Sequence, residues 1–254
     1  MPLVFRHGTR SRRFVTFAYL LGAVVIFAAH VVFGLAGFGV GLVAMAFLPF
    51  IMTPATAVVL MTAYAMIFTV VLFVPLRRDF TPRAILGLLV GSIIGTPAGI
   101  WILAVAPPDV LNRLIGLMLV VVVALEFAGR FPRRLTAPGW GVGAGVLSGL
   151  IGGAVGLPGP PLVVYAATQD WSPRTFKANI QAFFIVNQGV ILAGYWFAGL
   201  LTAEVVRLTG AYLLPALAGT LLGMSLFHRV DPVRFRRIVF VLLFVSGAVL
   251  LVRG

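Results

Sequence analysis

Two glycine-rich stretches, each with prolines nearby, are the part of this sequence best suited to bind a small ligand. Residues 37–41 read Gly-Phe-Gly-Val-Gly and precede Pro49, and residues 152–161 contain four glycines and three prolines. Glycine lets the backbone approach a ligand closely, and proline interrupts a helix. An interrupted helix exposes free N–H groups at its positive end, which favours an anion. The residues predicted to contact the anion are Gly37, Phe38, Gly39, Gly41, Gly152, Gly153, Gly156 and Pro158.

Close helix packing is the alternative explanation of these glycines. Gly37 and Gly41 are four residues apart, as are Gly152 and Gly156. Small residues at this spacing let two membrane helices approach each other closely. We favour packing alone for three further sets with the same spacing, which are Gly91/Gly95/Gly99, Gly141/Gly145/Gly149 and Gly219/Gly223.

Four side-chain amides fall within one apolar stretch, at Asn179, Gln181, Asn187 and Gln188. Gln181 and Gln188 are seven residues apart, so they share one face of a helix. Amides in an apolar helix are unfavourable unless they line a cavity or bond to neighbouring helices. Both interpretations stay open, and in the first one Gln181, Asn187 and Gln188 donate hydrogen bonds to the ligand.

His30 is the histidine that lies well inside an apolar stretch, roughly 25 Å of helix beyond Arg13. Such a histidine could couple transport to protons or play a hydrogen-bonded structural role. The sequence contains no cysteine and no recognisable nucleophile, metal or nucleotide motif. We therefore expect no cofactor, no metal and no enzymatic activity. A membrane-embedded enzyme or lipid-handling protein is the alternative, with His30 and Glu126 as its reactive groups.

The composition requires a membrane protein. Of the 254 residues, 61% are apolar and 10% are charged, whereas soluble domains are about 45–50% apolar and about 25% charged. The net charge of +13 comes from arginines in short breaks between apolar runs, a pattern typical of membrane proteins rather than of nucleic-acid-binding ones. The apolar runs are too long for the alternating strands of a β-barrel. The predicted fold is all-α and polytopic.

An internal repeat divides the chain into two halves of four hydrophobic blocks each, about eight blocks in all. The first and fifth blocks are expected to be broken or re-entrant. Residues 35–42 align with 150–157, Thr53-Pro54 with Ser172-Pro173, and Gly91 with Gly219. In this register Thr62 and Thr69 correspond to Gln181 and Gln188. We expect a basic cytoplasmic N-terminus over 1–13, one repeat over 14–134 and the other over 138–254.

The distribution of arginine favours inverted halves. If every block crosses once from a cytoplasmic N-terminus, the first half follows the positive-inside rule and the second half violates it. Inverted repeats explain this reversal, provided that a broken block is re-entrant. Eight plain spans with a weak charge bias in the later loops are the alternative.

The broken segments, from Gly34 to Pro49 and from Ser148 to Pro158, resemble those of the sulfite exporter TauE/SafE family of membrane permeases. The resemblance covers about residues 15–252. It implies a secondary transporter of small sulfur-containing or organic anions, such as sulfite or a sulfonate, in a bacterial-type inner membrane. We expect alternating access at a site between the halves, with protons as a candidate coupling ion. A passive anion channel is an alternative, and a homodimer is compatible with the sequence.

Overall fold

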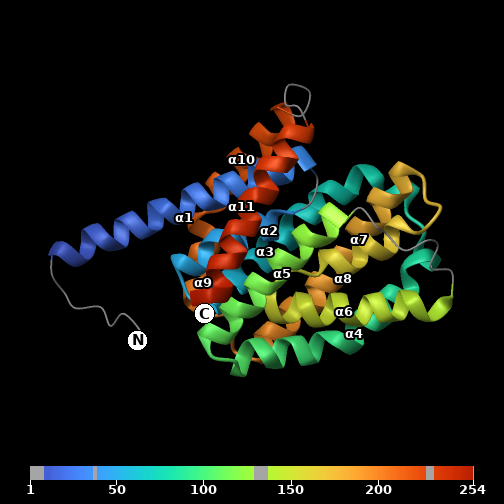
Figure 1. Cartoon of the computed structure of the whole chain (residues 1–254), viewed down its shortest axis with the longest axis horizontal. Coiled ribbons are helices and arrows are strands. Elements are labelled where there is room, and N and C mark those ends of the chain that lie inside the picture. Colours follow the sequence, from blue (N-terminus) through green and yellow to red (C-terminus); the bar gives the residue numbers. More distant parts are fainter. Residues whose placement is uncertain (1–8, 37–38, 129–136, 227–231, 254) are drawn as a thin grey trace.

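The computed structural model describes residues 9–36, 39–128, 137–226 and 232–253, and these residues form α-helices and no strand (Figure 1). The predicted polytopic helical fold is confirmed. The elements are α1 (Thr9–Ala36), α2 (Val40–Phe47), η1 (Leu48–Phe50), α3 (Pro54–Phe73), η2 (Val74–Asp79), α4 (Pro82–Val105), α5 (Pro108–Ala128), α6 (Pro138–Val155), α7 (Gly159–Ala167), α8 (Pro173–Phe197), α9 (Ala203–Ala211), α10 (Leu213–Leu226) and α11 (Pro232–Arg253).

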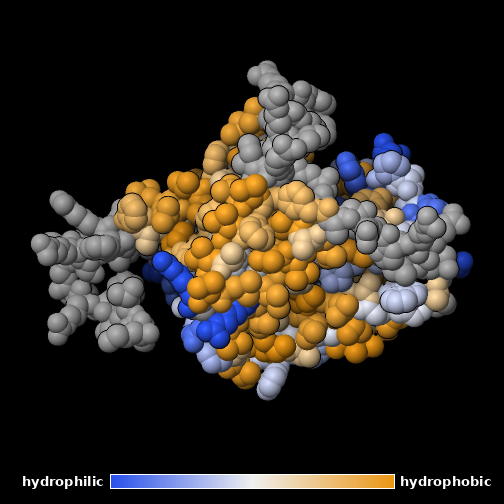
Figure 2. Space-filling view, viewed as in Figure 1, coloured by the Kyte–Doolittle hydropathy of each residue, from blue (hydrophilic) through white to orange (hydrophobic). Residues whose placement is uncertain are grey.

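Within the described residues, five helical segments are long and apolar enough to cross a membrane, and α9 with α10, bent by 45°, adds a sixth candidate. Most of the face shown in Figure 2 is hydrophobic, and the hydrophilic residues gather toward its ends. This is the surface expected of a protein surrounded by lipid. The first and fifth hydrophobic blocks are each divided into two helices, α1 with α2 and α6 with α7, as predicted.

Helices α3 and α8 begin with the same local signal. The Thr53 hydroxyl accepts a hydrogen bond from the backbone N–H of Thr56 at 3.2 Å, and the Ser172 hydroxyl accepts one from Thr175 at 3.2 Å. In both helices a proline occupies the first turn, where its missing N–H costs nothing. Two caps of the same geometry therefore start the two helices that the repeat aligns.

Two helix pairs, α4 with α6 and α1 with α10, pack with their backbones in near contact. A Cβ added to either of two glycines on α4 would overlap a carbonyl oxygen of α6, and the same holds for α10 against α1. The prediction that these glycines serve packing is confirmed. The overlapping pairs are Gly91 with Val142, Gly95 with Val146, Gly219 with Phe27, and Gly223 with Val31.

These two interfaces match each other in the register of the sequence repeat. Phe27 corresponds to Val142 when residues 35–42 are aligned with 150–157, and Gly219 corresponds to Gly91. The first helix of each half, α1 or α6, thus packs against a helix from the third hydrophobic block of the other half, α10 or α4. Sequence numbers rise together along both members of each pair, so the paired helices run parallel.

The second broken block folds back on itself. A Cβ at Gly152 would lie 2.9 Å from Pro158 Cβ, and one at Gly141 would lie 3.2 Å from the Tyr165 hydroxyl oxygen. Helix α7 therefore runs antiparallel to α6 and returns toward the end at which α6 begins. This is the path of a re-entrant hairpin.

An ion pair connects the start of α8, which follows this hairpin, to the end of η2, which follows α3. The Arg174 guanidinium Nε lies 3.1 Å from Asp79 Oδ2, and the Thr81 N–H donates to Asn179 Oδ1 at 2.9 Å. The segment after α3 and the start of α8 consequently lie at the same end of the molecule (Figure 1). Eight plain spans would place them on opposite faces of the membrane, so the pair agrees with a re-entrant fifth block.

Candidate functional site

Each break is marked by a glycine in the left-handed region. Gly39 has φ +87° and precedes α2, and Gly156 has φ +70° and follows α6. Residues with a side chain rarely adopt this conformation. The prediction that the chain breaks here is confirmed. Gly37 and Phe38, which we also predicted to contact the ligand, lie outside the described residues.

The two breaks lie against each other, although they are far apart in the sequence. A Cβ added to Gly41 would lie 3.2 Å from the Gly156 carbonyl oxygen and 3.1 Å from Leu157 Cδ2. On the other side of Gly156, a Cβ would lie 3.4 Å from Val58 Cγ1 of α3. The first turn of α2 therefore packs onto the last turn of α6, beside α3. Of the glycines predicted for the site, the structure thus brings Gly41 of the first half against Gly156 of the second.

Free N–H groups come from the first break. The first backbone bond of α2 runs from the Val43 N–H to the Gly39 carbonyl at 3.3 Å. The N–H groups of Val40, Gly41 and Leu42 therefore have no acceptor within their own helix. These three donors and the positive end of α2 point toward the break and favour negative charge.

The second break offers fewer donors than we expected. The Gly156 N–H donates to the Gly152 carbonyl at 3.0 Å, so it is engaged within α6. Gly152 and Gly153 also lie in helical turns of α6. Helix α7 then opens with a glycine followed by two prolines, and proline has no N–H. Gly159 is consequently the main free donor of this first turn.

Helix α8 covers the second break with one face. Gln188 lies four residues after Phe184 and three before Ile191, so all three share that face. The Tyr195 hydroxyl, one turn further, donates a hydrogen bond to a carbonyl at the end of α6. Phe184 Cζ would lie 3.7 Å from a Cβ added to Gly159, and Ile191 Cδ1 would lie 3.0 Å from a Cβ added to Gly152. The Tyr195 hydroxyl oxygen lies 2.8 Å from the Gly153 carbonyl oxygen.

Two amides on α8 are buried and unpaired. Asn187 is 0% exposed, and neither its Nδ2 nor its Oδ1 has a hydrogen-bond partner among the described residues. Gln188 is 3% exposed, and its Oε1 likewise has none. An unpaired buried polar group costs about 1–3 kcal/mol. Such groups are therefore expected where a ligand or an ordered water belongs.

The other polar residues of this region have different surroundings. Asn179 accepts a hydrogen bond from the Thr81 N–H, which ties α8 to the start of α4. Gln181 is 6% exposed and lies two turns before Gln188. On α3, the Thr62 hydroxyl donates to the Val58 carbonyl at 2.8 Å. Of the four amides singled out from the sequence, Asn179 thus has an evident structural role.

His30 lies in an aromatic enclosure between α1 and α3. Its ring centroid is 4.7 Å from that of Phe68, 5.4 Å from that of Tyr64 and 6.4 Å from that of Phe33. The ring is 0% exposed, and Nδ1 lies 2.8 Å from the Ile26 carbonyl oxygen. His30 is therefore grouped with aromatic rings of the first half rather than with the amides of α8. The side chain of Glu126 lies outside the described residues.

The sequence did not single out four residues that shape the site, which are Val58, Phe184, Ile191 and Tyr195. The last three could have been found by helical spacing from Gln188. Nothing in the sequence identified Val58, because its role depends on a contact between the halves. Within the described residues, no three histidine or acidic side chains come together to bind a metal.

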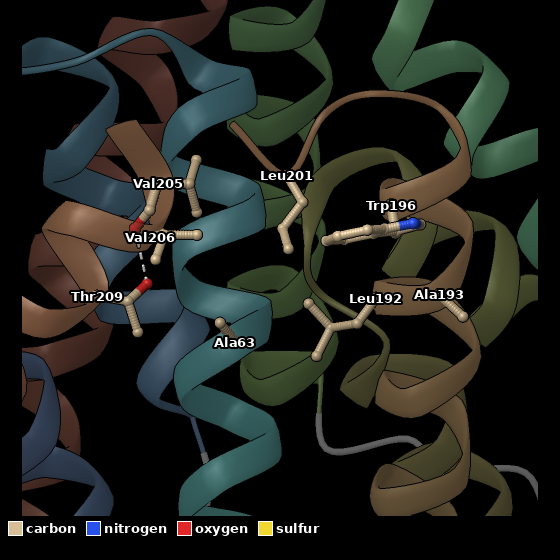
Figure 3. A pocket seen from close by; sticks show the side chains of 8 residues that line it. All are labelled: Ala63, Leu192, Ala193, Trp196, Leu201, Val205, Val206 and Thr209. Atoms are coloured by element: carbon tan, nitrogen blue, oxygen red, sulfur yellow. Dashed lines mark hydrogen bonds between the residues drawn. The ribbon is translucent and has the colours of Figure 1, made fainter. Parts of the chain in front are cut away.

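An open groove of about 420 Å³ lies outside this site, between α3, α8 and α9 (Figure 3). Its lining is apolar, and the hydroxyl of Thr209 is turned to the Val205 carbonyl at 2.8 Å. Trp196 and Val206 in its wall are mostly exposed. The lining residues are Ala63, Leu192, Ala193, Trp196, Leu201, Val205, Val206 and Thr209. The groove contains none of the predicted site residues.

Comparison with known proteins places the chain in a family. The family model described as Sulfite exporter TauE/SafE matches residues 21–250, nearly the whole chain. No curated protein and no solved structure matches the chain. Proteins of this family are membrane transporters and not enzymes. The chain therefore belongs to the sulfite exporter TauE/SafE family.

Proposed function

We propose that the protein is a secondary transporter of small anions, such as sulfite, a sulfonate or a related organic anion. One observation carries this proposal. The two helix breaks meet at Gly41 and Gly156, and the α8 face that covers the second break carries a buried amide without a partner. Breaks at corresponding places of two repeats are typical of transporter binding sites.

The donor set suits an anion. Three N–H groups at the start of α2 point toward the break, and Asn187 and Gln188 can each donate through a side-chain amide. None of these groups carries a full charge, so a bound anion is held by hydrogen bonds and by the positive end of α2. We propose that Gly37 and Phe38 complete the site from the first break.

We propose that two inverted repeats, over 14–134 and 138–254, provide alternating access. The matched helices α3 and α8 support the inverted relation, because α3 ends near Asp79 whereas α8 begins beside it. The reciprocal packing of α1 on α10 and of α6 on α4 supports the repeat itself. Rocking of one repeat against the other would then expose the site to each side in turn.

We propose that the protein resides in the cytoplasmic membrane of a bacterial-type cell, with its orientation set by charge. One end carries Arg77, Arg78, Arg83, Arg174 and Lys177, and among the described side chains the other end carries Arg113, Arg207 and Arg253. The positive-inside rule places the first end in the cytoplasm. The start of α1 then lies outside, opposite to the expectation from the basic N-terminus, and reporters fused to both termini distinguish the two orientations.

Transport by purified protein in liposomes tests the proposed function. Wild-type protein should exchange labelled sulfite, with a rate that saturates as sulfite increases. Asn187→Leu should lose this exchange, whereas Gly189→Ala should keep it, because an added Cβ at Gly189 meets no atom within 4 Å. Flux that rises linearly with concentration would instead indicate a channel, and no flux of any small anion would contradict the proposal.

A further inference from the structure

One nitrogen of His30 is held as a proton acceptor. A backbone carbonyl oxygen only accepts hydrogen bonds, so the contact between Nδ1 and the Ile26 oxygen at 2.8 Å fixes the ring proton on Nδ1. In the neutral ring, the lone pair then lies on Nε2. Nε2 is buried and has no partner among the described residues.

Burial of His30 opposes its charged form, and the aromatic rings around it offset part of that cost. The rings of Phe68, Tyr64 and Phe33 surround the imidazole, and aromatic faces attract cations. Tyr64 of α3 is the titratable group that faces His30. Helix α10 contacts His30 at Gly219, where it has no side chain, and a Cβ added there would lie 3.0 Å from His30 Cβ. No charged side chain of the described residues bonds to the ring.

Tyr64 packs its ring against that of His30 and bonds to α9 through its hydroxyl. The Tyr64 hydroxyl donates to the Thr209 carbonyl at 2.6 Å, and Tyr212 follows one turn later. The ring of Tyr212 lies 6.3 Å from that of Tyr19. The exposed Arg207 guanidinium carbon lies 5.9 Å from the Tyr19 ring centroid. Tyr64 thus connects the aromatic enclosure of His30 to α9.

We infer that His30 is the proton-binding group of the transporter, with Nε2 as the atom that takes up the proton. This inference rests on the proposed anion transport. Nε2 takes up one proton, and the ring becomes an imidazolium while Nδ1–H keeps its bond to Ile26. The proton leaves from the same nitrogen when the repeats expose the other side.

Protonation of His30 should strengthen anion binding. His30 lies seven residues before the first break, or roughly 10 Å along α1. At that distance a positive charge in a protein interior changes the affinity for a monovalent anion on the order of tenfold. Protonation and anion binding therefore favour each other, which is the coupling that a proton-linked transporter requires.

Liposomes that hold the purified protein test this inference through two readouts, sulfite exchange without a pH gradient and sulfite accumulation driven by one. His30→Gln should abolish driven accumulation and raise the half-saturating sulfite concentration on the order of tenfold, while maximal exchange persists. Gly210→Ala on α9 is the control and should match wild type, because an added Cβ meets no atom within 4 Å. The ionisation of sulfite itself is the same in every sample, so it cancels in the comparison.

The outcomes separate this inference from the proposed function. Driven accumulation by His30→Gln at the wild-type level would overturn the inference, as would a wild type that exchanges sulfite but ignores the pH gradient. A wild type without exchange would instead contradict the proposed function. If His30→Gln does not fold, His30→Phe takes its place, because a phenyl ring keeps the aromatic packing against Phe68 and removes the titratable nitrogen. It should also lose driven accumulation and keep maximal exchange, and driven accumulation at the wild-type level would overturn the inference.

Discussion

Asn187 should reveal a conflict between stability and function. Its two amide atoms are buried without partners, and burying such an unpaired amide destabilises the folded protein by about 1–3 kcal/mol. Leucine has a similar size and no polar atoms. Asn187→Leu should therefore raise the free energy of unfolding of the ligand-free protein by about 1–3 kcal/mol. For a chain of this size the change corresponds to a Tm increase of about 2–10 °C.

The same substitution should remove ligand binding. A ligand that binds only the folded state raises Tm, because it increases the free energy of unfolding, by about 2.7 kcal/mol at a hundred times its Kd. Sulfite should produce this shift in wild-type protein and not in Asn187→Leu. The assay is thermal unfolding of the detergent-purified protein, with and without sulfite.

Asn179→Leu is the matched control, on the same helix and at the same 0% exposure. Asn179 accepts a hydrogen bond from the Thr81 N–H, whereas its Nδ2 is buried without a partner among the described residues. The two contributions oppose each other, so Asn179→Leu should change the free energy of unfolding less than Asn187→Leu does and should preserve the sulfite-induced shift. A lower Tm for Asn187→Leu, together with an intact sulfite shift, would refute the reasoning. That result would make Asn187 a structural residue like Asn179.

Three further predictions concern the backbone and the topology. Gly39→Ala should destabilise the protein by about 1–2 kcal/mol, and Gly39→Asn by less, because asparagine tolerates a positive φ; thermal unfolding of the two variants compares them, and equal Tm values would count against strain at this break. Gly95→Ala should separate α4 from α6 and reduce folded yield, whereas Gly143→Ala should not, because a Cβ at Gly143 meets no atom within 4 Å; size-exclusion chromatography measures both. Cysteines at Asp79 and Arg174 should be joined by a short bis-maleimide in this naturally cysteine-free chain, because the two side chains meet at their tips, and gel mobility detects the cross-link; failure to cross-link would favour eight plain spans.

Features that depend on local chemistry were predictable from the sequence. The apolar composition predicted the helical membrane fold, and the paired motifs at Thr53 and Ser172 became two caps of the same geometry. Glycine spacing identified Gly91 and Gly219 as packing residues because a bare backbone is needed wherever two helices touch. The breaks were found because glycine and proline act on their own segment.

Features that depend on contact between the halves were not predictable. Helices that are apolar all round give no periodicity to show which face meets which neighbour. The contacts of Gly156 with Gly41 and with Val58 of α3 therefore had no signal in the sequence. The shortage of donors at α7 is different, because two prolines after Gly159 already imply it.

Direct binding of sulfite to the purified protein tests the central claim, that a small anion binds where the two breaks meet. Isothermal titration calorimetry should show saturable binding to wild type, no binding to Asn187→Leu and weaker binding to Gly41→Val, whose side chain would press on Leu157 and the Gly156 carbonyl. Gly189→Ala should bind as wild type does. Two results would contradict the claim. One is sulfite binding of equal affinity in all four proteins, and the other is no binding of sulfite or of any other small anion to any of them.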